Sequence, residues 1–278
     1  MSIIYEPTGM AKEYSPYACN LYIGCSHCCR YCYAPHTLQR TADNYFGVPQ
    51  PRKDVLKYLE MDLKKKRFDK QILLSFIGDV YCKNADNSQT TRTALKLLDY
   101  YNAPVAVLSK GGTRMLRDID VFKEFGEHIT VGSTLTFLDP VKSKQWEPGA
   151  AVPEDRLETL LTLHNAGIRT FASFEPVVEP AESLRLIERT LKDDSVDHYK
   201  VGKLNNYKGL DKGIDWQSFL AEAIVMLREA GKQIYIKKCL RDLAPNVQLF
   251  EDEIDPERYI VRQGEKEEIV FQQTLECF

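Results

Sequence analysis

The sequence predicts an α/β protein built around a partial, half-open barrel of parallel strands that alternate with helices. Short apolar runs rich in branched side chains alternate with helical patterns along most of the chain, which is typical of repeated strand-helix units around a parallel sheet. Of the 278 residues, 44% are apolar, which is enough for one large core. Glycine and proline also stand where helices would begin and end.

Each predicted element follows from its own pattern. The predicted strands are short runs of branched and aromatic residues: 18–23, 71–77, 104–109, 129–136, 169–174, 198–204 and 232–237. The predicted helices carry apolar residues three or four positions apart, as at Leu157, Leu160 and Leu163: 52–66, 89–101, 114–125, 153–166, 181–192 and 215–230. Pro153, followed by two acidic residues, favours a helix start, and Gly167 and Gly231 favour helix ends.

The pattern changes near the end of the chain. Residues 1–242 contain no Ser/Gly-rich linker and no internal repeat, so they are expected to form one barrel domain. Residues 250–278 hold nine acidic and three basic side chains, a net charge of −6. We interpret residues 243–278 as a strand-rich appendage rather than an independent domain. No apolar run is long enough to cross a bilayer, so no membrane association is expected.

Five of the eight cysteines lie within fourteen residues, and Cys25, Cys29 and Cys32 form a C-x3-C-x2-C run. A [4Fe-4S] cube has four irons, so three protein thiolates hold it and leave one iron open to an outside molecule. Each residue advances the chain by at most about 3.5 Å, so this spacing lets the three sulfurs reach neighbouring corners of one cluster. Gly24 can adopt the backbone angles that a loop leaving the preceding strand needs. The sequence therefore predicts a catalytic iron-sulfur site.

The same cysteines allow other interpretations. Cys25 with Cys28 and Cys29 with Cys32 form two C-x2-C pairs, which could hold a structural zinc or form redox disulfides. Zinc sites usually recruit a second pair from distant sequence, and the other cysteines here are scattered. Residues 1–16 lack the apolar core of a signal peptide, which favours a reducing cytoplasm over a disulfide framework. A zinc-binding structural or interaction module remains the alternative of another class.

The stretch from Cys19 to Ala34 closely resembles the cluster loop of radical S-adenosylmethionine (SAM) enzymes, and the nearest branch is the spore photoproduct lyase group, related to DNA repair photolyases. The resemblance covers roughly residues 15–180. Further segments follow in the family's order: Gly78-Asp79-Val80-Tyr81, Thr91-Arg92, Leu108-Ser109-Lys110, Leu116-Arg117-Asp118-Ile119-Asp120, Glu147-Pro148-Gly149 with Arg156, and Ala166-Gly167-Ile168.

This resemblance implies two cofactors, a [4Fe-4S] cluster and SAM. SAM would chelate the open iron, and an electron from a reductant such as flavodoxin or ferredoxin would cleave it to a 5′-deoxyadenosyl radical. The implied SAM contacts are Tyr31 under the adenine, Gly78 and Asp79 at the methionine amino group, Lys110 at its carboxylate and Ser133 at the ribose. The implied fold is the radical SAM partial barrel.

One position departs from the lyase pattern. Lyases that repair spore DNA carry a hydrogen-donor cysteine three residues before the strand-end aspartate, where this chain has Phe76. Cys82 lies three residues after Asp79 instead, and we predict that it donates a hydrogen atom to a substrate radical. The alternative is that Cys82 is a small buried apolar side chain. Cys28 is expected to pack behind the cluster loop.

The substrate is less constrained by the sequence. Glu175, Lys203 and the segment from Lys200 to Asn206 follow or close predicted strands, where barrel enzymes gather their chemistry, so they are candidate substrate contacts. Without the acidic tail, the net charge of residues 1–249 is +3, which is only faintly basic. By resemblance the leading hypothesis is action on a nucleic-acid base or nucleotide, by repair or modification. The missing donor cysteine and the weak charge favour the alternative, a small metabolite or a peptide.

Overall fold

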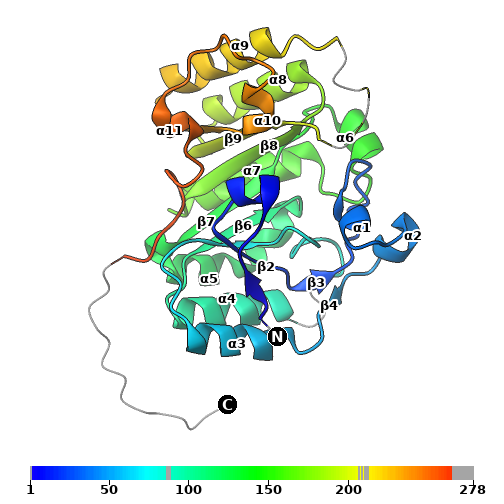
Figure 1. The fold of residues 1–278 in the computed structure, drawn as a ribbon, viewed down its shortest axis with the longest axis vertical. Helices are drawn as coiled ribbons and strands as arrows, with labels where there is room; N and C mark the ends of the chain where they lie inside the picture. Colours follow the sequence, from blue (N-terminus) through cyan, green and yellow to red (C-terminus); the bar gives the residue numbers. More distant parts are fainter. Residues whose placement is uncertain (1, 86–88, 206, 208, 210–212, 265–278) are drawn as a thin grey trace.

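A single mixed sheet of eight strands organises the molecule (Figure 1). The computed structural model describes residues 2–85, 89–205, 207, 209 and 213–264. The strand order is β1-β2-β5-β6-β7-β8-β9-β10, and every neighbouring pair is parallel except β1 with β2. The first and last strands in this order do not pair with each other in the described part of the chain, so the predicted half-open arrangement is confirmed. The strands are β1 Ile4–Tyr5, β2 Tyr17–Cys19, β5 Ile72–Leu74, β6 Val105–Ser109, β7 Ile129–Thr134, β8 Thr170–Val177, β9 His198–Lys203 and β10 Gln233–Ile236.

Helices connect successive parallel strands and pack in two apolar groups. One group surrounds β5, β6 and β7 with α3, α4 and α5, and the other surrounds β8, β9 and β10 with α7, α8 and α9. All six residues of β7 are buried, as expected for a parallel strand covered on both faces. The helices are α1 Ala34–Thr37, α2 Ala42–Tyr45, α3 Val55–Lys65, α4 Thr90–Tyr100, α5 Ile119–Glu124, α6 Pro140–Trp146, α7 Pro153–Asn165, α8 Pro180–Lys192, α9 Trp216–Glu229, α10 Lys238–Arg241 and α11 Glu251–Ile254.

The predicted strand 18–23 is wrong as one element. Its first part is β2, whereas Tyr22–Ile23 forms β3, which leaves the main sheet and pairs with β4, Gln50–Pro51. Asn20 marks the break because its side chain accepts hydrogen bonds from the backbone nitrogens of Phe76 and Ile77, both at 2.9 Å. The predicted helix 114–125 is likewise divided into a 3₁₀ segment, Gly112–Asp118, and α5. Both breaks depend on contacts distant in sequence.

The prediction of a strand-rich tail is wrong for residues 243–264. This segment contains α11 and an isolated bridge between Lys70 and Arg262, and residues 265–278 lie outside the described residues. The acidic run that suggested a separate appendage favours a helix start instead, since Glu253 accepts a hydrogen bond of 2.7 Å from the Phe250 nitrogen. Glu253 is also buried in an ion pair of 2.6 Å with Arg228 of α9. The described tail therefore packs onto the barrel.

The N-terminal segment crosses the sheet from one edge toward the other, a feature that the sequence did not predict (Figure 1). We call residues 9–14 the N-terminal strap; it contains the 3₁₀ turn Gly9–Glu13. The Tyr14 hydroxyl shares a hydrogen bond of 2.6 Å with Ser173 of β8. Glu13 Oε2 accepts hydrogen bonds from the Tyr235 hydroxyl of β10 and the Lys238 nitrogen, at 2.7 and 3.0 Å. The strap thus ties the two halves of the open barrel together.

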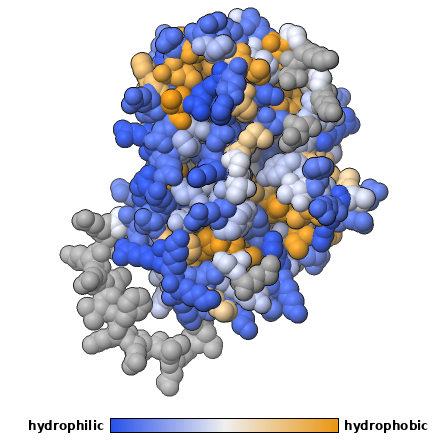
Figure 2. Space-filling model, in the orientation of Figure 1, coloured by the Kyte–Doolittle hydropathy of each residue, from blue (hydrophilic) through white to orange (hydrophobic). Residues whose placement is uncertain are grey.

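The surface is mainly hydrophilic on the face that Figure 2 shows, with apolar side chains in separate groups rather than one continuous patch. Among the residues that the structure describes, no helix combines the length and apolar character needed to span a bilayer.

Candidate active site

A cavity of about 360 Å³ opens at the carboxyl ends of the parallel strands. Leu73 of β5, Leu108 and Ser109 of β6, Thr134 of β7 and Glu175 of β8 line it, together with residues that follow β9 and β10. In a parallel sheet these ends meet on one side, which is where barrel enzymes place their chemistry. The cavity therefore lies where the sequence analysis expected the site.

The three predicted cluster ligands come together on one wall of this cavity. Cys25, Cys29 and Cys32 all line it, and their thiols are free. Gly24, with φ of +88°, turns the chain out of β3 into this loop, which we call the cluster loop, residues 24–33. A Cβ atom on Gly24 would lie 3.0 Å from the Tyr45 carbonyl, so the turn requires glycine as predicted. Three thiols facing one cavity are a donor set that suits an iron-sulfur cluster.

The alternative uses of these cysteines find no support in the geometry. Every cysteine that the structure describes is free of disulfide bonds. Within the described ranges, no three His, Cys, Asp or Glu side chains are arranged to hold a single metal ion. Cys28 does not line the cavity; its thiol donates a hydrogen bond of 3.5 Å to the Ser26 carbonyl, and its backbone has φ of +53°. The loop is thus not preorganised around one zinc ion.

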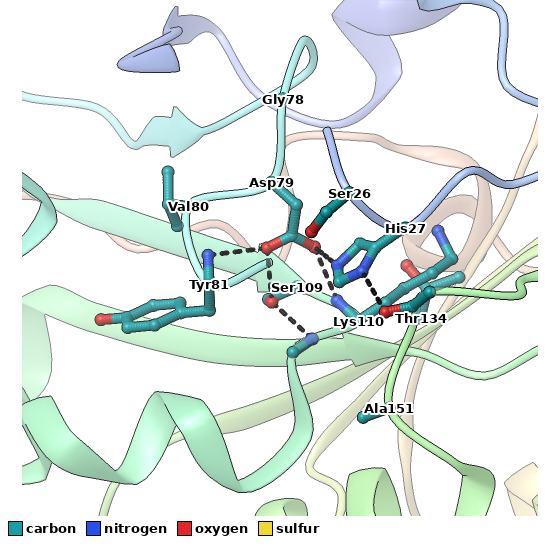
Figure 3. Close-up of polar contacts among 12 residues, drawn as sticks. Ser26, His27, Gly78, Asp79, Val80, Tyr81, Ser109, Lys110, Thr134 and Ala151 are labelled. Atoms are coloured by element: carbon teal, nitrogen blue, oxygen red, sulfur yellow. Dashed lines mark hydrogen bonds and ion pairs between the residues drawn. The ribbon is translucent and has the colours of Figure 1, made fainter. Parts of the chain in front are cut away.

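Asp79 connects the cluster loop to the sheet, as Figure 3 shows. Its carboxylate accepts hydrogen bonds from the Ser109 hydroxyl at 2.7 Å and from the Lys110 and Tyr81 backbone nitrogens at 2.8 Å. His27 Nε2 of the cluster loop lies 2.9 Å from the same carboxylate. Burial opposes the charge, but His27 and these hydrogen bonds hold the pKa of Asp79 well below its usual range. Asp79 lines the cavity near Gly78, yet its oxygens are already engaged in positioning the loop.

The Glu147-Pro148-Gly149 motif supports the cluster loop from the other side. Glu147 is buried, with Arg156 at 2.5 Å and the Thr136 hydroxyl at 3.1 Å, and it also accepts a hydrogen bond from the Tyr31 hydroxyl. Although burial opposes ionisation, Arg156 and Lys110 lower the pKa of Glu147. The Gly149 nitrogen donates to the His27 carbonyl at 2.8 Å. This supporting role was missed in the sequence, where the motif pointed only to a family branch.

Gly149 touches the loop so closely that no other residue fits. A Cβ atom there would lie 1.9 Å from the Ser26 carbonyl oxygen and 2.9 Å from the Ser26 carbonyl carbon. These are backbone atoms, so the cluster loop itself would have to move. The path of the loop is therefore fixed by Gly149 behind it.

Two of the predicted SAM contacts lie side by side on the cavity wall. The Lys110 ammonium is 5.5 Å from the centre of the Tyr31 ring, within range of a cation–π interaction. Burial opposes its charge, but the negative charges of an ionised Cys29 and of Glu147 raise the pKa of Lys110. No ion pair joins Lys110 to a described carboxylate, whereas many other lysines have one. Lys110 thus offers a positive charge to a ligand.

The structure does not bring Ser133 and Cys82 to the cavity wall. Ser133 is fully buried and donates to the Ser109 carbonyl at 3.1 Å, while its neighbour Thr134 lines the cavity. Side chains alternate along a strand, so a one-residue difference decides which side chain faces the site. Cys82 is buried, and the neighbouring Cys25 thiol lowers the pKa of Cys82. Hydrogen donation by Cys82 stays a prediction.

The facing wall carries a buried ion pair. Lys237, which follows β10, is 2% exposed, and its ammonium lies 2.8 and 2.9 Å from the two carboxylate oxygens of Glu175. Asn205 donates to Glu175 at 3.2 Å. Glu175 lies where the pairing of β8 with β9 is irregular, a feature that often redirects a side chain into a site. Of the predicted substrate contacts, Glu175, Leu204 and Asn205 line the cavity, whereas Lys203 does not, and Asn206 lies outside the described residues.

Lys200 lies behind this wall rather than on it. Its ammonium is buried and donates to the Tyr14 carbonyl at 3.0 Å. Burial and the nearby charge of Lys237 lower the pKa of Lys200 to about 7. The N-terminal strap completes the wall, because Met10, Ala11 and Tyr14 line the cavity.

A sequence model of the radical SAM superfamily matches residues 19–193. The chain belongs to the radical SAM superfamily. An uncharacterized protein of Methanocaldococcus jannaschii is 32% identical over 162 residues, which is 58% of this chain and 60% of that protein. An uncharacterized protein of Acidianus two-tailed virus is 25% identical over 252 residues, covering 82% of this chain and 80% of the viral protein. The chain thus spans less than two thirds of the first of these relatives.

Solved radical SAM enzymes share the fold at low sequence identity. A spore photoproduct lyase variant with bound AdoMet and dinucleoside spore photoproduct superimposes with a TM-score of 0.55 at 12% identity, covering 85% of this chain and 63% of the lyase. Streptococcus suis SuiB bound to its precursor peptide SuiA gives 0.60 at 13% identity, covering 84% and 52%. These likenesses concern the fold, and the bound molecules belong to those proteins.

Enzymes of the radical SAM superfamily use a [4Fe-4S] cluster and SAM and need a reductant. The three thiols on one cavity wall and the free charge of Lys110 beside them match these needs. The remaining motif residues act as supports. Arg92 of α4 pairs with Asp118 at 3.0 Å and also binds Asp120, and Asp118 accepts a hydrogen bond from the Tyr81 hydroxyl at 2.9 Å.

Proposed function

We propose that this radical SAM enzyme generates a 5′-deoxyadenosyl radical and uses it to modify or repair a nucleic-acid base or nucleotide. One observation carries the proposal: a single cavity has three cysteine thiols on one wall and a charge-neutral polar group among aromatic side chains on the other. The first wall supports radical formation, and the second supports binding of a flat, uncharged group with hydrogen-bonding edges.

On the first wall, Cys25, Cys29 and Cys32 would hold the cluster, and Lys110 and Tyr31 would hold SAM. When bound, the reduced cluster supplies the electron that cleaves SAM to methionine and the 5′-deoxyadenosyl radical. Lys110 is placed to bind the methionine carboxylate, because its ammonium faces the cavity without a described carboxylate partner. Gly78, which also lines the cavity, leaves room for backbone contacts to the methionine amino group.

On the facing wall, aromatic rings supply the faces against which a base can stack. The Tyr14 ring lies 4.6 Å from the Lys237 ammonium and packs edge to face with Phe76, and both rings line the cavity. Stacking on such rings is a common way to hold a base. Glu175 and Lys237 neutralise each other, so this wall neither attracts a phosphate strongly nor repels an uncharged ring. Asn205 beside them adds an amide, which matches the donors and acceptors on the edge of a base.

The test of this proposal follows an isotope. Reduced, reconstituted enzyme is incubated with SAM and with nucleosides, nucleotides or oligonucleotides that carry deuterium at defined carbons, and 5′-deoxyadenosine is examined by mass spectrometry. Transfer of deuterium from a base or sugar position is the expected result and names the carbon attacked. Transfer from deuterated peptides or small metabolites, with none from any nucleotide, contradicts the proposal.

Asn205 offers a variant that separates substrate binding from radical formation. Asn205→Ala removes a hydrogen-bonding amide from the facing wall, and the KM for the nucleotide substrate should rise by about tenfold. SAM cleavage in the absence of substrate should stay at the wild-type rate. Asn246→Ala, an exposed position that lies outside the cavity lining, is the matched control. Equal KM values for all three proteins would show that this wall does not bind the substrate.

A further inference from the structure

From Cys25 to Arg30 the cluster loop has an inner face and an outer face, because the side chains of these residues alternate. Cys25, His27 and Cys29 are buried and line the cavity. Ser26, Cys28 and Arg30 lie between them in sequence, are more exposed, and do not line the cavity. The inner face therefore meets the cofactor and substrate space, and the outer face is turned to solvent.

Basic residues from three separate segments meet at this outer face. Arg30 belongs to the loop itself and is exposed, and its backbone nitrogen donates to the Trp146 carbonyl at 2.9 Å. Lys83 is exposed, and its carbonyl accepts a hydrogen bond of 2.8 Å from the Ser26 hydroxyl. Lys144 is exposed, and its ammonium donates to the Pro148 carbonyl at 2.5 Å, one residue from Gly149, which binds the His27 backbone.

These three cations are not neutralised by the described part of the chain. No ion pair joins Arg30, Lys83 or Lys144 to a described carboxylate, whereas Lys142, two residues before Lys144, binds Glu179 and Glu182. The nearby carboxylate of Glu147 is buried and bound to Arg156, so it does not offset them at the surface. The outer face is thus a local positive surface on a chain whose net charge is −3.

We propose that this outer face, formed by Ser26, Cys28, Arg30, Lys83 and Lys144, is the docking surface for an acidic one-electron carrier protein. The proposal rests on the assignment of Cys25, Cys29 and Cys32 as cluster ligands. One electron leaves the reduced carrier and enters the cluster, so the carrier is oxidised and the cluster reduced by one electron each. SAM and substrate would occupy the inner face. The outer side of the cluster loop therefore offers the electron the short path to the cluster.

Charge complementarity explains why the carrier would be acidic. Opposite charges on two protein surfaces steer their encounter and raise the association rate by 10-fold or more at low salt. The effect weakens as ionic strength rises, since the Debye length is about 8 Å at physiological salt. A phosphate backbone would be attracted by the same charges, so the experiment has to separate the two partners.

The experiment compares two reductants on the reconstituted holoenzyme. Stopped-flow absorbance follows cluster reduction by a reduced flavodoxin, as the acidic protein carrier, and by photoreduced deazariboflavin, as a small neutral reductant. In the variant Arg30→Glu/Lys83→Glu/Lys144→Glu, reduction by flavodoxin should slow by about tenfold at low salt. The difference from wild type should shrink as salt is added. Reduction by deazariboflavin should be unchanged.

A matched control carries the same change in net charge elsewhere. Lys57→Glu/Lys65→Glu/Lys96→Glu places three reversals on exposed positions of α3 and α4, and it should be reduced by flavodoxin at the wild-type rate. Lys83→Glu alone, which alters a side chain without a described hydrogen bond or ion pair, should slow reduction by about threefold and serves if the triple variant loads less iron.

Several outcomes would overturn the proposal. Flavodoxin rates equal to wild type in both outer-face variants, or an equal loss with the α3 and α4 control, would show that the outer face is not the docking surface. The same holds if the outer-face variants lose oligonucleotide binding in a salt titration while flavodoxin still reduces them normally, because the charges would then serve a nucleic acid. None of these readouts depends on which substrate the enzyme modifies.

Discussion

The cavity wall that carries the three cysteines is built from one short loop, whereas the facing wall takes its polar side chains from three strands that are far apart in the sequence. Cys25, Cys29 and Cys32 lie within eight residues, but Glu175 and Lys237 are separated by 62 positions. The first wall is fixed by local spacing and by supports behind it, such as Gly149. The second depends on strand register and on a strap from the other end of the chain. The residues shared with a superfamily thus lie in a local motif, whereas the wall that we propose to bind the substrate is assembled from the sheet.

The largest expected effect comes from removing the three cysteines of the first wall. The variant Cys25→Ala/Cys29→Ala/Cys32→Ala removes the proposed ligands, so iron and sulfide contents should fall to background and SAM cleavage should be lost. Cys28→Ala, within the same loop but outside the cavity lining, should keep the brown colour and the activity. Retained iron in the triple variant would refute the ligand assignment and remove the basis of the comparison.

The next effect concerns the second wall and should leave the first intact. Lys237→Met leaves the Glu175 carboxylate without its buried partner, so the free energy of unfolding should fall by about 3 kcal/mol. Chemical denaturation measures this loss. In the double variant Glu175→Gln/Lys237→Met no charge is left behind, and most of the stability should return. A double variant as unstable as Lys237→Met would show that packing rather than charge holds this wall.

The sequence predicted the first wall more completely than the second, where it indicated Glu175 and Asn205 but not the ion pair with Lys237. The C-x3-C-x2-C spacing and Gly24 fix the loop without reference to distant residues, so the cysteines could be found from the sequence. The alternation of strands and helices likewise predicted the sheet and six of its connecting helical segments. Ser133 was named from the family resemblance, and nothing local in the sequence tells which of two neighbouring strand residues faces the cavity. The Lys237–Glu175 pair and the strap depend on contacts across more than 60 positions, which no local pattern encodes.

A smaller effect tests how far the first wall depends on its support. Gly149→Ala would place a Cβ atom 1.9 Å from the Ser26 carbonyl, so the loop must shift, and iron content should fall to a fraction of the wild-type value. The free energy of unfolding should decrease by about 2 kcal/mol. Gly167→Ala is the control, because its Cβ would meet no atom within 4 Å and only left-handed backbone strain of about 1 kcal/mol is added. Normal iron content in Gly149→Ala would show that the loop needs no such support.

The smallest effect is a pH dependence behind the second wall. The pKa of Lys200 in the folded protein is about 7, below its ordinary value of 10.5. Between these two values the unfolded chain binds one more proton than the folded chain, so the free energy of unfolding rises with pH, by at most about 1.4 kcal/mol per pH unit. Lys200→Met should flatten this rise when denaturation curves are compared at pH 8 and pH 9, so that over this one unit the two proteins differ by about 1 kcal/mol. Parallel pH profiles for the two proteins would show that Lys200 keeps an ordinary pKa.

The N-terminal strap has a consequence for biosynthesis. Residues 10–14 leave the ribosome more than 220 residues before their partners Lys237, Tyr235 and Lys238. Contacts so distant in sequence form late, because the intervening chain must be ordered before they can close. The cluster loop can fold early, but the cavity around it is complete only after the last strand, β10, is in place. Until those contacts close, the three cysteine thiols are reachable from the side of the cavity that the strap and β10 later complete.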